Sequence, residues 1–153
     1  MSLKDRITED MKAAMRAKET DRLGTIRMLL AAMKQKEVDE RVVLDDTAII
    51  AIVDKLIKQR KDSLAAFLQA ARQDLADKES FEMTVLEAYL PARLSADEVA
   101  TQVKAIVAQV AAELGRAAAP GDMGKVMGQA KAQLAGKAEI GQISATVKAA
   151  LAG

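Results

Sequence analysis

Apolar residues recur with helical spacing through nearly the whole of this chain, and the two-residue alternation typical of strands is nowhere sustained. Leu3, Ile7, Met11 and Ala14 form one such stripe, with Ser2 positioned to cap the helix that carries it. The pattern constrains the chain to an all-α fold. Four helices are expected before residue 91, over about 3–17, 20–33, 46–71 and 74–90, with the charged run 34–41 expected to fray.

Pro91 interrupts the pattern, because proline lacks the N–H that would continue a helix and restricts the residue before it. Ser95 and Glu98 then form the sequence pattern of a capping box, which opens a helix that ends near Gly115. Two further helices are expected over about 123–135 and 140–151. We therefore expect a bundle of about four helices over residues 1–91 and a small three-helix domain over residues 92–153.

The chain has no cysteine and no histidine. Thiolate chemistry, disulfides, the usual zinc sites and imidazole catalysis are therefore excluded. We expect no catalytic residue, no metal site and no cofactor. The first ten residues are charged and lack the apolar segment of a signal peptide, and no apolar run approaches the roughly 18–20 residues that cross a bilayer. These features predict a cytoplasmic protein without a membrane partner.

Arg60 lies within the apolar stripe of the third expected helix, close in projection to Phe67. A buried charge without a partner is costly, so a carboxylate should meet it. Projection of the fourth helix places Glu82 on the inner face, with Glu79 nearby. We interpret Arg60 and Glu82, with Glu79 able to share the contact, as a structural ion pair. The alternative is an anion-binding site. The aromatic residues are all placed on inner faces: Phe67, Phe81 and Tyr89.

Gly124 and Gly128 lie four residues apart and are expected to let another backbone pack closely. Neither the spacing of these glycines nor that around Gly136 matches a Walker loop, and no strand precedes them. Gly136 is expected to end a helix in the left-handed conformation. Lys137 follows it and either is simply solvated or helps to bind a phosphate with the free N–H groups of the last helix.

The last two helices carry a modest excess of positive charge. Residues 123–153 contain four lysines against one acidic residue, Glu139. With few aromatic side chains to stack on bases, RNA binding is expected to depend on shape and backbone contacts. The candidate RNA-binding residues are Lys125, Lys131, Gly136, Lys137 and Lys148.

Several segments spread nearly end to end along the chain form a shared pattern: residues 25–32, 57–63, 77–79, 89–91, 94–95, 124–127 and 136–138, together with Glu82. Together they resemble the YqeY-like family, which is related to the tail domain of the B subunit of the aspartyl/glutamyl-tRNA amidotransferase. It implies a helical N-terminal domain and a three-helix C-terminal domain. In the amidotransferase the corresponding tail contacts the elbow side of the tRNA.

The resemblance implies a noncatalytic accessory module that interacts with tRNA or with a tRNA–protein complex. The family label would be carbon–nitrogen ligase activity with glutamine as amido-N donor, but the amidase and kinase-like parts of that enzyme are missing here. Two alternatives stay open: a helical protein–protein adaptor, and a component of a carbon–nitrogen ligase complex that acts only with other subunits.

Overall fold

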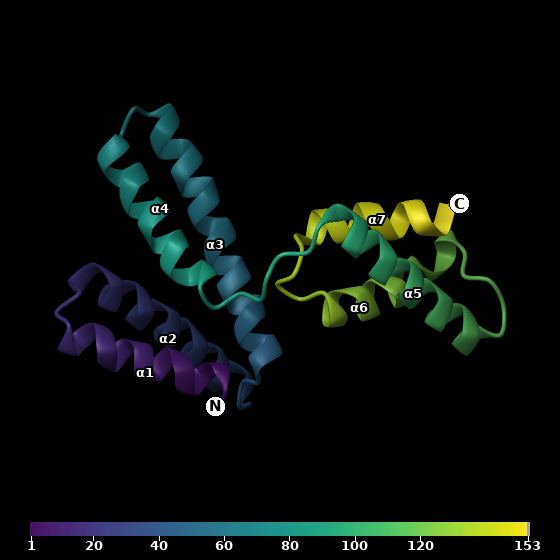
Figure 1. The fold of residues 1–153 in the computed structure, drawn as a ribbon, viewed down its shortest axis with the longest axis horizontal. Helices are drawn as coiled ribbons and strands as arrows, with labels where there is room; N and C mark the ends of the chain where they lie inside the picture. The colour runs from purple at the N-terminus through teal and green to yellow at the C-terminus, as the bar shows by residue number, and fades with distance from the viewer. Residues whose placement is uncertain (153) are drawn as a thin grey trace. The chain divides into compact units, whose positions relative to one another are not determined.

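The computed structural model describes residues 1–152, and within them the chain is all-α with no strand, as the sequence predicts (Figure 1). Seven α-helices and one 3-10 turn follow one another. Their bounds are α1 Leu3–Arg16, α2 Thr20–Glu40, α3 Asp46–Gln69, α4 Gln73–Glu87, α5 Ala96–Leu114, η1 Pro120–Asp122, α6 Met123–Gln133 and α7 Ile140–Ala152.

Residue contacts divide the chain into two compact units, Met1–Leu90 and Pro91–Gly153. The first unit contains α1 to α4, and the second contains α5, η1, α6 and α7. Each unit has a hydrophobic cluster of its own. No helix among residues 1–152 combines the length and apolar character needed to cross a membrane.

Local side-chain chemistry fixes where several helices begin. Ser2 and Ser95 each accept a hydrogen bond from the backbone N–H three residues on, and Asp5 and Glu98 accept one from the cap residue in return. These are complete capping boxes, which satisfy N–H groups that otherwise lack a partner. Asp45 caps α3 in a similar way, by accepting from the Ala48 N–H at 2.8 Å.

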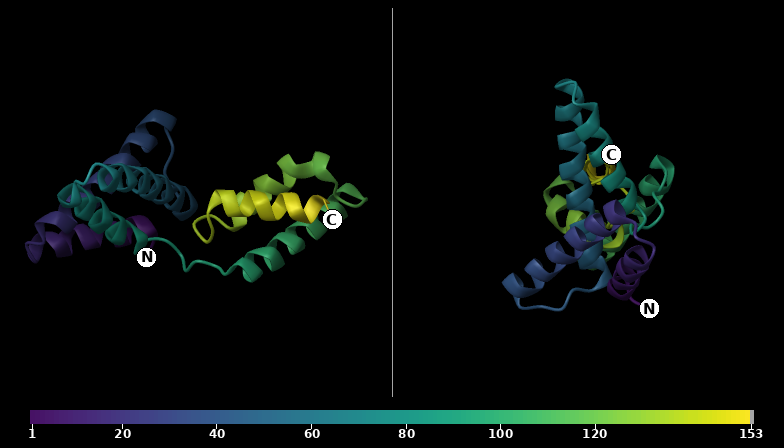
Figure 2. Two further views of the ribbon diagram at one scale, coloured as in Figure 1. Left: turned by 90° about the horizontal axis from the view of Figure 1, so that it is seen from above. Right: turned by 90° about the vertical axis from the view of Figure 1, so that its left-hand side faces the viewer.

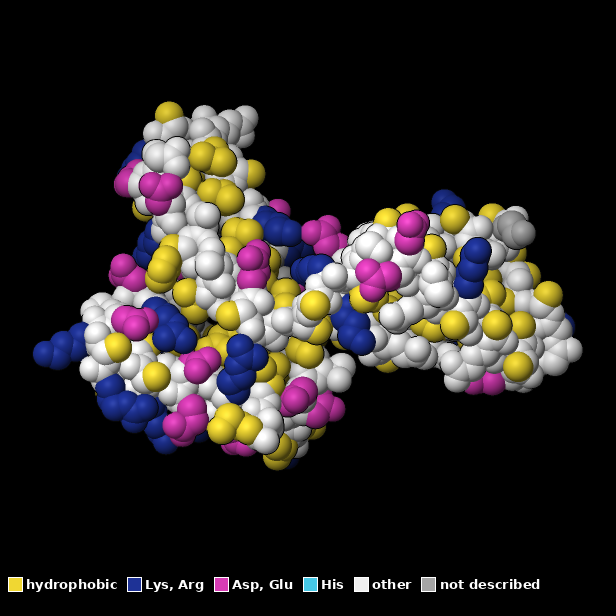
Figure 3. All heavy atoms as spheres, in the orientation of Figure 1, with side chains coloured by type: hydrophobic (Ala, Val, Ile, Leu, Met, Phe, Trp, Pro, Cys, Tyr) yellow, Lys and Arg dark blue, Asp and Glu magenta, His cyan; other side chains and the backbone are white. Residues whose placement is uncertain are grey.

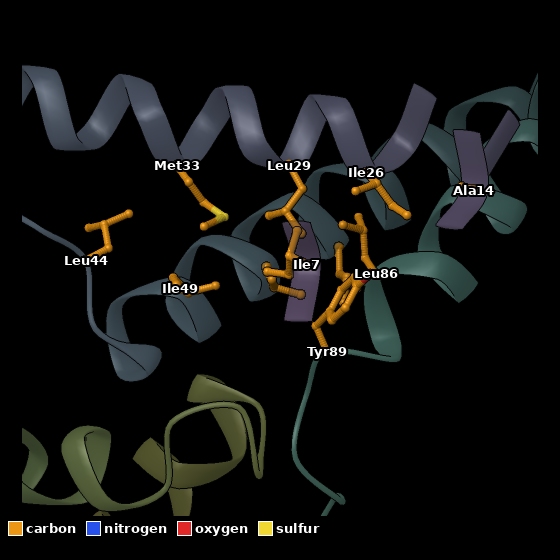
Figure 4. Packing of buried hydrophobic residues seen from close by; sticks show 11 residues of the cluster. Ile7, Ala14, Ile26, Leu29, Met33, Leu44, Ile49, Leu86 and Tyr89 are labelled. Carbon is orange, nitrogen blue, oxygen red and sulfur yellow. The ribbon is translucent and has the colours of Figure 1, made fainter. Parts of the chain in front are cut away.

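The core of the first unit lies between α2 and the other three helices. In Figure 4, Met33, Leu29 and Ile26 of α2 point toward Ile49 of α3, Ile7 of α1 and Leu86 of α4. All six side chains are at most 1% exposed. The apolar stripes of four separate helices therefore meet in one cluster, as the periodicity requires.

The expected fraying of residues 34–41 is wrong, because α2 continues as a helix to Glu40. Lys4 of α1 donates two hydrogen bonds to the Glu37 carboxylate at 3.0 and 3.1 Å, and the Leu44 N–H donates a third at 3.3 Å. The Lys4 bond, followed by the Leu44 bond, lowers the pKa of Glu37. Contacts with other segments thus hold a charged stretch in a helix.

Helices α3 and α4 lie side by side as an antiparallel hairpin whose far end projects away from α1 and α2, as the views in Figures 1 and 2 agree. Phe81 of α4 is 43% exposed, so its predicted inward position is wrong. Tyr89 is buried: its hydroxyl donates to Asp10 Oδ2 at 2.7 Å, and the Arg6 guanidinium lies 5.2 Å from its ring centroid. Burial, followed by the hydrogen bond to Asp10, raises the pKa of Tyr89.

Candidate nucleic-acid interface

The second unit is built around one apolar cluster to which α5, α6 and α7 all contribute. Its fully buried members repeat every three or four residues along each helix, so each helix turns one stripe inward. They include Val99, Val103 and Val110 of α5, Val126 and Ala130 of α6, and Val147 of α7. The candidate lysines lie outside these buried stripes, Lys125 and Lys131 on α6, Lys148 on α7 and Lys137 in the turn between them.

The connection between α6 and α7 is a tight turn around Gly136 and Lys137. Gly136 is buried and has φ +72°, a left-handed conformation that glycine adopts without the steric cost of a side chain. The Lys137 N–H donates to the Leu134 carbonyl at 2.9 Å and closes the turn. The backbone of the turn is therefore ordered by its own sequence.

A second set of contacts anchors the turn to the segment that precedes α5. Arg93 Nη1 donates to the Gly136 carbonyl at 3.0 Å, and the Leu94 N–H donates to the Lys137 carbonyl at 2.8 Å. Lys137 is half-buried, and hydrogen bonds hold its main chain through both its N–H and its carbonyl. This anchoring could not be predicted from the sequence, because it joins residues more than forty positions apart.

The start of α7 lies next to this turn, and the Glu139 carboxylate adds a negative charge there. Glu139 directly precedes α7, and its carbonyl accepts a hydrogen bond from the Ile143 N–H at 3.0 Å. A carboxylate at a helix N-terminus already complements the positive end of the helix dipole. A phosphate that approaches Lys137 at this helix end therefore meets one negative charge.

The other candidate lysines do not form a single cluster on α6. Lys125 forms an ion pair with Glu113 of α5, with 3.4 Å between Lys125 Nζ and Glu113 Oε2. Lys131 and Lys148 are exposed. The six-residue step from Lys125 to Lys131 turns about 120° around the helix axis, so these two lysines flank opposite sides of α6.

Gly124 and Gly128 do not serve as packing glycines in the described chain, contrary to expectation. Both are exposed, and a Cβ placed on either would meet no atom within 4 Å. Their four-residue spacing does put them on one face of α6, but that face is turned away from the apolar cluster.

An ion pair that the sequence did not suggest braces the loop between α5 and α6. Arg116 donates to both carboxylate oxygens of Asp122, at 2.9 and 3.0 Å, and the Ala119 N–H donates to Asp122 Oδ2 at 2.8 Å. The Arg116 bonds, followed by the Ala119 bond, lower the pKa of Asp122 to about 2. The pair holds the chain where it enters η1 and α6.

In the first unit, Arg60 and Glu82 lie together across α3 and α4, with 2.9 Å between Arg60 Nε and Glu82 Oε2. Their side chains are 12% and 17% exposed, so the pair lies at the edge of the core. Arg60 also donates to the Leu56 carbonyl at 3.1 Å and to the Met28 sulfur. Within the described residues Glu79 makes no hydrogen bond or ion pair with Arg60.

Within residues 1–152, no three acidic side chains gather in a group that could hold a metal ion. Arg27, which lies at the edge of the α2 stripe, is exposed. The chemical resources of the second unit are thus exposed lysines, an anchored turn and helix ends.

Comparison with known proteins gives a family match along almost the whole chain. The model of the family described as "Yqey-like protein" matches residues 4–151. Several relatives carry the name "Altered inheritance of mitochondria protein 41, mitochondrial". The relative from Eremothecium gossypii is 41% identical over 104 residues, which cover 66% of this chain and 57% of the relative. The relative from Kluyveromyces lactis is 39% identical over 109 residues, covering 71% and 58%.

The third relative, from Pyrenophora tritici-repentis, is 31% identical over 129 residues, covering 82% of this chain and 70% of the relative. The matches to the first two span a little more than half of those proteins' length. The names of these relatives contradict the prediction of a cytoplasmic protein, since each relative is named as mitochondrial. That prediction rests on the charged first ten residues and on the lack of a membrane-length apolar run, and neither feature determines a compartment.

Proposed function

Since this chain belongs to the family of Yqey-like proteins, we propose that it is a noncatalytic accessory module whose second unit contacts folded tRNA. The observation that carries the proposal is the anchored Gly136–Lys137 turn, which holds a lysine beside the start of α7. The N–H groups of a helix's first turn lack partners within the helix and favour anions. The resemblance to the amidotransferase tail supplies the class of nucleic acid.

The charge of the second unit sets the expected strength of binding. The net charge of residues 123–153 is +3, from four lysines and Glu139. Few phosphate contacts and no exposed aromatic ring in this segment mean weak, salt-sensitive binding that follows the shape of the RNA. We expect a dissociation constant of about micromolar or weaker.

The test is a titration of the full chain with folded tRNA at several salt concentrations. Lys137→Ala is expected to weaken binding and to reduce the slope of log K against log salt by about 1, because one phosphate contact is lost. Lys104→Ala, which removes an exposed lysine of α5 in the same unit, is the matched control and is expected to change little. Equal losses in both variants, or binding that ignores salt, would contradict the proposal.

A protein–protein adaptor is the second candidate, and one observation favours it. The far end of the α3–α4 hairpin exposes Leu68 and Phe81, at 52% and 43%. One of these side chains lies on each helix of the hairpin, and exposed apolar surface is a feature of protein–protein interaction sites.

A further inference from the structure

The far end of the α3–α4 hairpin, residues 61–81, is rich in apolar residues that the first unit does not bury. We call this segment the hairpin tip. Only Ala76 is buried within it, although it also contains Leu64, Phe67, Leu68, Leu75 and Phe81. None of these side chains belongs to the core cluster or packs against it. The tip is therefore a single layer of two helices. In a stable domain such a layer usually packs against a further element.

The Arg60–Glu82 pair marks where the core of the first unit ends. On one side of the pair, Ile57 and Leu86 are buried in the cluster. On the other side, the tip begins, and in Figure 3 hydrophobic side chains are visible over this part of the hairpin. The guanidinium of Arg60 reaches α2 through Met28, and no core residue lies farther along the hairpin. The apolar surface of the tip therefore lies beyond the part of the hairpin that packs against α2.

The two arms of the hairpin carry opposite charge. Residues 55–69 of α3 contain four Lys or Arg and one Asp, a net charge of +3, whereas α4 (Gln73–Glu87) contains one Lys and five Asp or Glu, a net charge of −4. Removing the internal Arg60–Glu82 pair from both counts, and Asp74 of α4, which pairs with the neighbouring Arg72, leaves +2 and −2. The surface is therefore complementary to itself: a copy turned through a two-fold axis can set each basic arm against an acidic arm.

We propose that the hairpin tip is a self-association surface through which two copies of this chain pair in solution, with α3 of each copy against α4 of the other. The apolar side chains of the tip supply the buried centre of the contact, and the charged arms set its register. The result is an antiparallel four-helix arrangement in which each hairpin acquires the second layer that it lacks alone.

Sedimentation velocity of the full chain over a range of concentrations tests the pairing. Wild type is expected to shift from monomer to dimer as concentration rises. Leu68→Glu and Phe81→Glu are each expected to weaken the dimer at least about tenfold, because a charge enters the apolar centre. Both side chains are substantially exposed, so far-UV circular dichroism and the thermal midpoint should stay close to those of wild type.

Val43→Glu is the matched control, since Val43 is an 86% exposed apolar residue of the same unit that lies outside the tip. It is expected to leave the dimer unchanged. A wild-type chain that stays monomeric at every concentration overturns the proposal, and so does a dimer that Val43→Glu weakens as much as Leu68→Glu. If wild type is monomeric and Leu68→Glu loses tRNA binding, the hairpin tip binds RNA. This result would also overturn the proposal of self-association.

Charge reversal tests the register independently. The variant Lys58→Glu with Lys61→Glu makes both arms acidic, and Asp77→Lys with Glu79→Lys, which leaves the Arg72–Asp74 pair in place, makes both arms basic. Each variant alone is expected to be monomeric, because like charges face each other across the two-fold axis. An equimolar mixture is expected to form a heterodimer of about wild-type affinity. A mixture that stays monomeric contradicts the pairing of α3 with α4.

Discussion

Arg60 of α3 connects three helices of the first unit through its side chain. It contacts Glu82 of α4, the Leu56 carbonyl of its own helix and the Met28 sulfur of α2. Arg60→Ala leaves the Glu82 carboxylate, 17% exposed, without its cation. Because water still reaches the pair, we expect a loss of about 1.5–3 kcal/mol, the range for hydrogen bonds to charged groups, and not the larger cost of a fully buried pair.

Urea denaturation of Arg60→Ala, Arg60→Met, Glu82→Leu and the double variant checks this expectation. The double change of Arg60→Met with Glu82→Leu is expected to cost less than the sum of the two single changes, because no charge is left without a partner. A loss below about 0.5 kcal/mol for Arg60→Ala would show that the pair contributes no more than a surface salt bridge.

The contact between Arg60 and Glu82 could be predicted from the sequence, and the reason is geometric. Arg60 and Glu82 fall on facing stripes of neighbouring helices, so projection alone brings them together. The contact with Met28 depends on how α2 crosses the hairpin, and the residue pattern of a single helix does not show this crossing. The inward position predicted for the Phe81 side chain is wrong, because the width of the buried stripe on α4 depends on what covers the hairpin.

Among the elements, the loop that enters α6 shows how a polar pair can order a connection. The pKa of Asp122 is about 2, against an ordinary value of 3.8, because Arg116 and the Ala119 N–H donate to its carboxylate. A depressed folded-state pKa stabilises the fold above the unfolded-state value, and this contribution fades as pH falls from 3.8 toward 2. Asp122→Asn is therefore expected to lower stability near neutral pH.

The measurement is the unfolding free energy of wild type and Asp122→Asn as a function of pH. The difference between the two proteins is expected to be constant above about pH 5 and to shrink between pH 3.8 and pH 2. A difference that does not change with pH would mean that Asp122 acts through packing and not through its charge.

Helix positions were predictable, because the periodicity of apolar residues, the serine caps and the breaks at Pro91 and Gly115 are local signals. The long-range contacts of the candidate site were not. Gly136 was recognised as a left-handed residue, but the donors from Arg93 and Leu94 that hold its turn come from a distant segment. The four-residue spacing of Gly124 and Gly128 identifies the helix face that they share, but it does not show whether another element packs against that face.

On the scale of the whole molecule, the two units are expected to behave as separate domains joined at residues 90–95. Limited proteolysis with a nonspecific protease should cut first in this segment, because the Leu90–Ala92 backbone lies between two units with separate cores. The loop at residues 116–122 is expected to resist longer, since the Arg116–Asp122 pair braces it. First cleavage within α3 would contradict the two-domain organisation.

The proposed contact with folded tRNA lies at the turn between α6 and α7 of the second unit. Amide NMR spectra of the ¹⁵N-labelled full chain during titration with folded tRNA test it most directly. The proposal predicts shifts that gather on residues 134–142, decline with added salt and diminish in Lys137→Ala. An absence of shifts, or shifts confined to α1, α2, α3 and α4, would contradict it.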